Sequence, residues 1–71
     1  DGGPAGMVLV SKIIAETPQF LKPGGWLLVE IDSPQADLCR GVIAQTNAYD
    51  EVKVENDAER RPRVVMARRK T

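Results

Sequence analysis

Hydrophobic residues recur with a helical period near the start of the chain. Between residues 7 and 17, four residues spaced by three or four fall on one side, with Lys12 and Glu16 opposite; the four are Met7, Val10, Ile14 and Thr17. This spacing predicts an amphipathic helix. Most of residues 1–6 favour turns, so we expect a loop there or the entry to that helix.

The helix is expected to be interrupted at Thr17 and Pro18. Thr17 suits the N-cap of a second short turn, and Pro18 suits its first position. That turn, over residues 18–21, would carry Phe20 and Leu21 inward. The many β-branched residues of the first helix lower its intrinsic propensity, so we expect packing to supply its stability.

A sharp turn and an apolar strand follow. Residues 22–25 are Lys-Pro-Gly-Gly, in which Pro23 presets the first central position of a type II turn and Gly24 accepts the positive φ of the second. Residues 26–31 show no polar residue until Glu30. A strand this apolar is usually covered on both faces, as in a parallel sheet with helices on either side. We therefore expect it to lie inside a larger layered molecule.

A second helix is predicted to begin near Asp32. Asp32 or Ser33 can cap it, and Gln35 lies three residues after Asp32, as in a capping box. Within residues 35–47 one apolar stripe is expected, made of Leu38, Cys39, Val42 and Ile43. Gly41 weakens the middle of this helix and is expected to permit close packing.

Two further strands are predicted, residues 49–56 with Val52 and Val54 half-buried, and residues 63–68. The polar residues 57–62 would connect them. A strand–helix–strand unit favours a parallel pair with a right-handed crossover, and the short last connection favours an antiparallel neighbour. We predict an α/β fold with the order helix, strand, helix, strand, strand. It would be one half of an open, doubly wound sheet, with the last strand antiparallel and residues 1–71 as a single unit.

Composition excludes several classes of site. The 71 residues include no histidine and one cysteine, Cys39, so neither an internal disulfide nor a Cys/His metal site is expected. Cys39 fits a reducing cytosol better than a secreted scaffold, so we expect a cytoplasmic protein. No apolar run approaches the roughly 18 residues of a membrane span. The first residue is Asp1 rather than Met, and we expect the chain to be a fragment.

The charges are unevenly distributed. Six of the ten basic residues and none of the ten acidic residues lie in residues 60–71. Such a basic tail can mark a nucleic-acid contact. Basic residues flanking an exposed strand end are the simpler explanation, which we favour.

Motifs along almost the whole chain resemble one family. They are Asp-Gly-Gly with a following glycine at residues 1–6, the segment Ile13–Ile31 with its Pro-Gly-Gly turn and strand glutamate, Gln35, Tyr49 after the second helix, Asp57, and the Arg-Val-Val ending from Arg63. This combination resembles the C-terminal portion of a class I, Rossmann-like, S-adenosylmethionine-dependent methyltransferase. It is most similar to the release-factor glutamine methyltransferases of the HemK/PrmC family. The chain departs from the family at Asp32, where glycine is common, and at Asn47-Ala48, which replace Ala-Gly.

The resemblance implies an enzyme that uses S-adenosyl-L-methionine to methylate a glutamine side-chain amide in a peptide-chain release factor. The amide nitrogen is a poor nucleophile, so catalysis depends on positioning it. The family's Gly-rich cofactor loop and its Asn-Pro-Pro-Tyr motif are absent from residues 1–71. We therefore expect no catalytic, cofactor-binding or metal-binding residue in this piece. It would be structural and inactive alone.

Three residues are candidates for the rim of the substrate site: Glu30, Asp32 and Gln35. Glu30 at the carboxyl end of a strand can also pair with a neighbouring arginine or cap the next turn, and we favour that interpretation. Helix capping explains Asp32 and Gln35 about equally well. Trp26 is expected to be buried beside Leu28 rather than to stack on a ligand.

Two alternatives stay open for the function. The chain can belong to a different class I methyltransferase that acts on RNA or a small molecule. It can also be a free-standing α/β module that binds RNA or a protein through residues 60–71. In the whole methyltransferase fold, residues 26–31 would pair with a preceding strand that is absent here, so we predict that the isolated piece self-associates or aggregates through this apolar edge.

Overall fold

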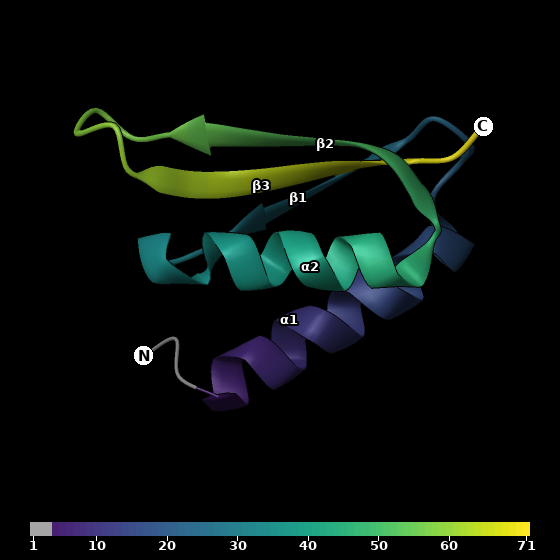
Figure 1. The fold of residues 1–71 in the computed structure, drawn as a ribbon. Coiled ribbons are helices and arrows are strands. Elements are labelled where there is room, and N and C mark those ends of the chain that lie inside the picture. The colour runs from purple at the N-terminus through teal and green to yellow at the C-terminus, as the bar shows by residue number, and fades with distance from the viewer. Residues whose placement is uncertain (1–3) are drawn as a thin grey trace.

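Two helices and a three-stranded sheet make up the chain in a computed structural model, which describes residues 4–71 (Figure 1). The elements are α1 (Pro4–Glu16), η1 (Thr17–Phe20), β1 (Trp26–Glu30), η2 (Ser33–Gln35), α2 (Ala36–Thr46), β2 (Tyr49–Asn56) and β3 (Pro62–Arg69), where η1 and η2 are 3₁₀ turns. The predicted order of helix, strand, helix, strand, strand is confirmed. Residues 1–3, part of the predicted glycine-rich segment, lie outside the described residues.

The sheet has the strand order β1-β3-β2, and β3 is antiparallel to both neighbours. The predicted antiparallel last strand is confirmed. β1 and β2 therefore run in the same direction, as a strand–helix–strand unit favours. They are not hydrogen-bonded to each other, however, so the prediction that they form a parallel pair is wrong. After the short connection at residues 57–61, β3 enters the gap between β1 and β2 and hydrogen-bonds to both.

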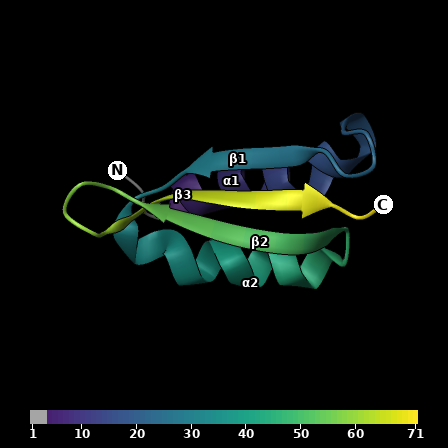
Figure 2. The same ribbon diagram turned by 90° about the horizontal axis from the view of Figure 1, so that it is seen from above.

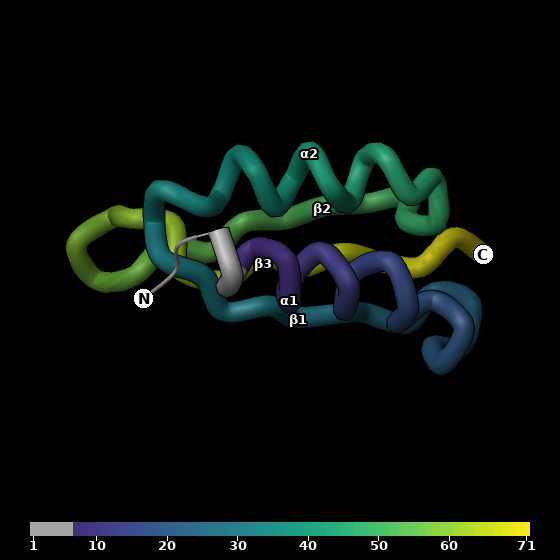
Figure 3. Tube along the Cα trace, turned by 90° about the horizontal axis from the view of Figure 1, so that it is seen from below, coloured from purple at the N-terminus to yellow at the C-terminus, as the bar shows by residue number. Residues whose placement is uncertain are grey.

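Both helices lie on one face of the sheet (Figure 1). Seen from above and from below, α1 crosses beneath β1 and β3, and α2 runs along the β2 side (Figures 2 and 3). The core lies between these two layers and contains side chains from both helices, from β2 and β3 and from the residue after β1: Ile14, Ile31, Ala36, Cys39, Ile43, Tyr49, Val65 and Ala67. Ile14 and the half-buried Val10 lie on the predicted apolar side of α1, with Lys12 and Glu16 exposed.

Within the described residues 4–71, one face of β1 is covered and the other is not. Leu27 and Val29 are half-buried against the core, but Leu28 on the other face is 62% exposed. The expectation that both faces of residues 26–31 are covered is therefore wrong for the described chain. Trp26 does lie beside Leu28, yet it is 36% exposed, so its predicted burial is also wrong. The face has no second layer because both helices pack on the opposite one (Figure 1).

That uncovered face, which we call the open face, carries a shallow hollow of about 490 Å³. It is lined by one or two residues from each strand: Trp26, Leu28, Lys53, Glu55 and Met66. The Lys53 ammonium lies 5.2 Å from the centre of the Trp26 ring, within the range of a cation–π contact. The open face thus combines an apolar strip on β1 and β3 with charged residues on β2.

The turn before β1 has the predicted chemistry. Gly24 has a φ of +82°, and the Gly25 N–H donates to the Lys22 carbonyl at 2.8 Å. The preceding turn differs from its prediction. Thr17 does not cap η1; its hydroxyl donates to the Ile13 carbonyl at 2.6 Å. Phe20 is 81% exposed rather than turned inward, because a 3₁₀ turn this short directs only part of its residues toward the core.

Helix α2 buries a narrower stripe than predicted. Cys39 and Ile43 are fully or almost fully buried, but Leu38 is 62% exposed. A Cβ on Gly41 would meet nothing within 4 Å, so the close packing expected there is wrong. The helix ends at Asn47, whose φ of 56° is the left-handed conformation typical of a helix C-terminus.

A buried hydrogen bond connects β2 to α1. The Tyr49 hydroxyl donates to the Ile14 carbonyl at 2.7 Å. That carbonyl cannot accept the usual hydrogen bond from the N–H four positions later, because that residue is Pro18, which lacks an N–H. Burial raises the pKa of Tyr49 and of the Cys39 thiol. The prediction that Cys39 is a small buried hydrophobic residue is confirmed.

Candidate functional site at the carboxyl end of β1

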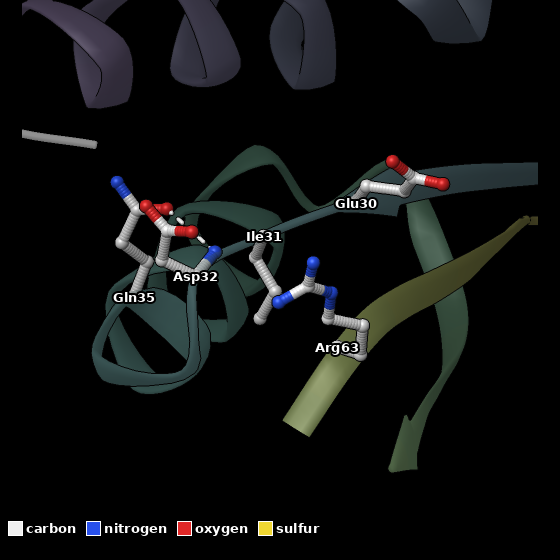
Figure 4. Close-up of a pocket in the computed structure, with 5 residues that line it drawn as sticks. All are labelled: Glu30, Ile31, Asp32, Gln35 and Arg63. Atoms are coloured by element: carbon white, nitrogen blue, oxygen red, sulfur yellow. Dashed lines mark hydrogen bonds between the residues drawn. The ribbon is translucent and has the colours of Figure 1, made fainter. Parts of the chain in front are cut away.

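The three predicted rim residues lie together. Glu30, Asp32 and Gln35 line one open hollow of about 230 Å³ with Ile31 and Arg63 (Figure 4). The hollow lies where β1 ends and the chain turns into η2 and α2. Its function is untested, so its assignment as a substrate rim stays a prediction. What the structure establishes is that three separate sequence positions meet in one place.

Two hydrogen bonds to backbone carbonyls of β3 hold the end of β1 and the start of η2 against the start of β3. The Ile31 N–H donates to the Arg63 carbonyl at 2.9 Å, which extends the strand pairing by one residue. The Ser33 hydroxyl donates to the Pro62 carbonyl at 3.1 Å. Ile31 is only 5% exposed, so its side chain anchors the hollow to the core. The backbone that carries the lining residues is therefore fixed by hydrogen bonds and by the burial of Ile31.

Asp32 and Gln35 form the capping box that the sequence predicts. The Asp32 N–H donates to the Gln35 Oε1 at 3.1 Å, and the reciprocal half of the box is also present. Asp32 has a φ of −82° and a ψ of 142°, an ordinary extended conformation. The aspartate that replaces the family's usual glycine is therefore accommodated without strain. Its carboxylate is exposed at the hollow while its backbone starts the turn.

Glu30 and Arg63 carry opposite charges at the hollow. Within residues 4–71 neither forms an ion pair with any other side chain, so the expected pairing of Glu30 with an arginine is wrong for the described residues. Figure 4 shows the Arg63 side chain reaching from β3 toward Ile31. Sequence reasoning placed Arg63 in the last strand but did not connect it with Glu30. The antiparallel register of β1 and β3 puts Arg63 beside Ile31, so Arg63 joins the lining of this hollow.

The hollow offers hydrogen-bonding groups of both kinds. The carboxylates of Glu30 and Asp32 accept hydrogen bonds, and the guanidinium of Arg63 donates them. An amide or a peptide backbone presents N–H and C=O groups close together and is complementary to such a set. Groups of acidic, histidine or cysteine side chains arranged for a metal ion are absent from residues 4–71.

The residues that line the hollow at the end of β1 do not fit a nucleoside-sized cofactor such as S-adenosylmethionine. Pockets for such ligands are typically about 300–1,000 Å³ and mostly apolar, whereas this hollow is smaller, open and lined by charged side chains. The glycine turn at residues 22–25 does not leave space for a cofactor either. A Cβ on Gly24 would meet the Arg68 guanidinium at 3.5 Å and the Thr71 side chain at 3.6 Å, so protein atoms already fill that space.

Several residues of the basic tail have partners within the fold. Arg68 pairs with Asp50, with 3.4 Å between the nearest charged atoms, and Arg61 pairs with Asp57 and Glu59. The Arg69 Nη1 donates to the Leu21 carbonyl at 2.7 Å. These contacts agree with basic residues that flank a strand, although they do not test nucleic-acid binding. No helix within residues 4–71 has the length and apolar character needed to cross a membrane.

Curated proteins similar to this chain all carry the same name. A release factor glutamine methyltransferase from Synechocystis is 38% identical over 68 residues, which are 96% of this chain and 23% of the relative. Proteins of that name from Mycobacterium leprae and Koribacter versatilis are 36% and 34% identical over 97% and 99% of this chain, and over 24% of each relative. No family model matches the chain, and no solved structure matches it significantly.

These similarities place the chain, with its mixed α/β fold, among the relatives of methyltransferases. More particularly, its homologues are release factor glutamine methyltransferases, which confirms the resemblance predicted from the sequence motifs. The chain spans about a quarter of the length of the curated relatives that it matches.

Proposed function

We propose that the chain is part of an S-adenosylmethionine-dependent protein methyltransferase that methylates a glutamine side-chain amide in a peptide-chain release factor. The observation that carries the proposal is similarity to proteins of that name over almost the whole chain, at 30–38% identity. The motifs that suggested the resemblance also support this proposal. They are the strand glutamate, the capping-box glutamine and the Arg-Val-Val strand. S-Adenosylmethionine would supply the methyl group.

In this proposal the piece has a structural part and a contact part. Its sheet supplies three strands, with β1 at an edge that has room for a further strand. Its hollow contributes Glu30, Asp32, Gln35 and Arg63 to the side where the substrate approaches. Because the target amide is a poor nucleophile, groups that hold the surrounding peptide raise the rate by orienting it. The 71-residue chain alone is expected to be inactive.

A chimera tests this function. Residues 4–71 of this chain replace the matching segment of the Synechocystis relative, and mass spectrometry follows methyl transfer to a glutamine of a release factor. We expect glutamine methylation by the chimera. A chimera that melts as cooperatively as the parent enzyme but transfers no methyl group to the release factor would overturn the proposal.

The contact part is tested in the same chimera. Arg63→Gln removes a charged donor at the hollow and is expected to raise KM for the release factor about tenfold, since a charge-assisted hydrogen bond contributes about 1.5–3 kcal/mol. Glu30→Gln is expected to act in the same direction. Glu51→Gln is the matched control, because Glu51 is an exposed strand glutamate at the opposite end of the sheet. If Glu30→Gln and Glu51→Gln change KM equally, the hollow is not part of the substrate site.

The other hypotheses stay predictions. A different class I methyltransferase, acting on RNA or a small molecule, would methylate its own substrate in the chimera assay and leave the release factor unmodified. A free-standing RNA-binding module would lose RNA binding when Arg60, Arg61, Arg68 and Arg69 become alanine. Cytoplasmic localisation likewise stays a prediction of the proposed function.

A further inference from the structure

The connection between β2 and β3, residues 57–61, lies at the same end of the sheet as the hollow. β1 and β2 run in the same direction, so the carboxyl end of β1 and the residues that follow β2 are at one end (Figure 2). The Ser33 hydroxyl, at the start of η2, donates to the carbonyl of Pro62, which directly follows this connection. Arg63, the next residue, lines the hollow itself. We call residues 57–61 the arginine turn.

Hydrogen bonds to one aspartate fix the backbone of the arginine turn. The Asp57 Oδ1 accepts from the N–H of Glu59 at 2.8 Å and from the N–H of Arg61 at 3.0 Å. The Asp57 carbonyl accepts from the Arg60 N–H at 2.9 Å, and the Asp57 N–H donates to the Arg61 carbonyl at 2.9 Å. The exposed side chains of this turn are therefore carried by an ordered backbone.

Arg60 occupies its position in the turn at a conformational cost. Its φ is +67°, in the left-handed region that glycine, asparagine and aspartate adopt far more readily than other residues. The Arg60 side chain is exposed, and within residues 4–71 it forms no ion pair that would offset this cost. Strained residues of this kind are concentrated at functional sites. The fold therefore supplies no reason for an arginine here, and a binding partner would.

The three arginines at this end of the sheet differ in how their charges are balanced. Arg61 pairs with both Asp57 and Glu59, so its charge is balanced inside the turn. Arg60 and Arg63 form no ion pair with any side chain in the described part of the chain. Two unbalanced guanidinium groups therefore lie at the end of the sheet that carries the hollow, one on the turn and one in the hollow.

We propose that Arg60 binds an acidic side chain of the protein substrate, next to the segment that the hollow holds. This inference rests on the proposed function, which supplies a polypeptide that approaches this end of the sheet. The exposed carboxylates of Glu30, Asp32 and Glu59 would repel a nucleic-acid backbone, whereas a polypeptide can present charges of both signs. Because the turn is already ordered, binding through it costs less conformational entropy than binding through a mobile loop.

Variants of Arg60 in the chimera separate its charge from its backbone conformation. Arg60→Gly removes the charge and relieves the strain, so KM for the release factor should rise about threefold while Tm rises by about 1–4 °C. Arg60→Glu should raise KM about tenfold, because it brings like charges together. Arg60→Lys keeps both the charge and the strained φ and should leave KM close to its original value. A purely structural role of Arg60 would change Tm without this order of KM values.

Salt and two matched controls test whether the effect is electrostatic and local. The rise in KM for Arg60→Gly should disappear at about 0.5 M salt, because exposed charges are then screened. Asn47→Gly changes the other non-glycine residue with a positive φ in residues 4–71, at 56°, without changing a charge. Lys22→Gln removes an exposed cation from the turn before β1, at the opposite end of the sheet. Both controls should leave KM unchanged.

Direct binding distinguishes a failure of this inference from a failure of the proposed function. Fluorescence anisotropy measures the Kd of the same chimeras for labelled release factor and, separately, for a labelled single-stranded RNA. If the chimera methylates the release factor but Arg60→Gly and Arg60→Glu leave KM and Kd unchanged, the contact is overturned and the proposed function stands. Binding of the release factor that depends on Arg60 without methyl transfer would refute the proposed function and leave the contact standing, and a chimera that does not bind would refute both. RNA binding that is lost in Arg60→Gly would assign the turn to a nucleic acid and also overturn the inference.

Discussion

Replacing Tyr49 by phenylalanine removes one oxygen atom from the core, with a cost that follows from its partner. The Tyr49 hydroxyl donates at 2.7 Å to the Ile14 carbonyl, and Pro18 cannot provide the N–H that this carbonyl would accept within the helix. Tyr49→Phe therefore removes the hydrogen bond that stands in for the missing i+4 donor at this buried carbonyl. The penalty for such a group is about 1–3 kcal/mol, larger than the net contribution of an average hydrogen bond.

Urea unfolding followed by the fluorescence of Trp26, the only tryptophan, measures this penalty. We expect Tyr49→Phe to lower the free energy of unfolding by about 2 kcal/mol with little change in the slope against urea. In a domain of this size each kcal/mol corresponds to about 4–8 °C in Tm, so the loss is also visible in a thermal melt.

The carbonyl argument has its own control in Pro18→Ala, which restores an N–H that can reach the Ile14 carbonyl. The change in Tyr49→Phe should be smaller in the Pro18→Ala background than in the wild type, with a coupling of about 0.5–1 kcal/mol. If Tyr49→Phe costs less than about 0.3 kcal/mol, or the two changes add without coupling, the carbonyl is not short of a partner and the reasoning is refuted.

Three further outcomes are expected. Gly24→Ala should destabilise the chain by about 1 kcal/mol or more because of the φ of +82°, whereas Gly41→Ala, in an exposed helical site, should stabilise it by about 0.5–1 kcal/mol; melts that shift in the same direction would contradict this. The backbone N–H of Arg61, then that of Glu59, holds the pKa of Asp57 below its usual value of 3.8. Since the folded-state pKa is lowered, the Asp57 carboxylate stabilises the fold above about pH 3.8, and this contribution is lost as the pH falls through the folded-state pKa; Asp57→Asn should flatten the acid side of the stability curve, and an unchanged acid side would count against it. Because burial raises the pKa of the Cys39 thiol, a thiol reagent at pH 8 should react only as urea unfolds the chain, and reaction at the rate of a free thiol would disprove the burial.

Features with a local cause could be predicted from the sequence. The turn at residues 22–25 depends on Pro23 and on the positive φ of Gly24, and both constraints lie within four residues. The capping box of Asp32 and Gln35 is equally local. The two helices, the three strands and their order follow from hydrophobic periodicity, which is also a local property.

Features that depend on a second layer could not be predicted in the same way. An apolar residue such as Leu28 or Leu38 is suited to burial, but whether another element covers it depends on contacts elsewhere in the molecule. The position of β3 between β1 and β2 likewise depends on contacts between residues far apart in the sequence. Arg63 reaches the hollow at the end of β1 because β3 pairs with β1, so this member of the candidate site was missed although its neighbours were found.

The central place of β3 has a consequence for biosynthesis. β1 and β2 are both synthesised before β3, and they do not pair with each other. Their backbone N–H and C=O groups therefore remain without strand partners until β3 has left the ribosome. Helix α2 can form early, but the layer it packs against cannot. A nascent chain arrested before about residue 62 would expose two unpaired strands that are prone to aggregation. We expect such a chain to bind chaperones.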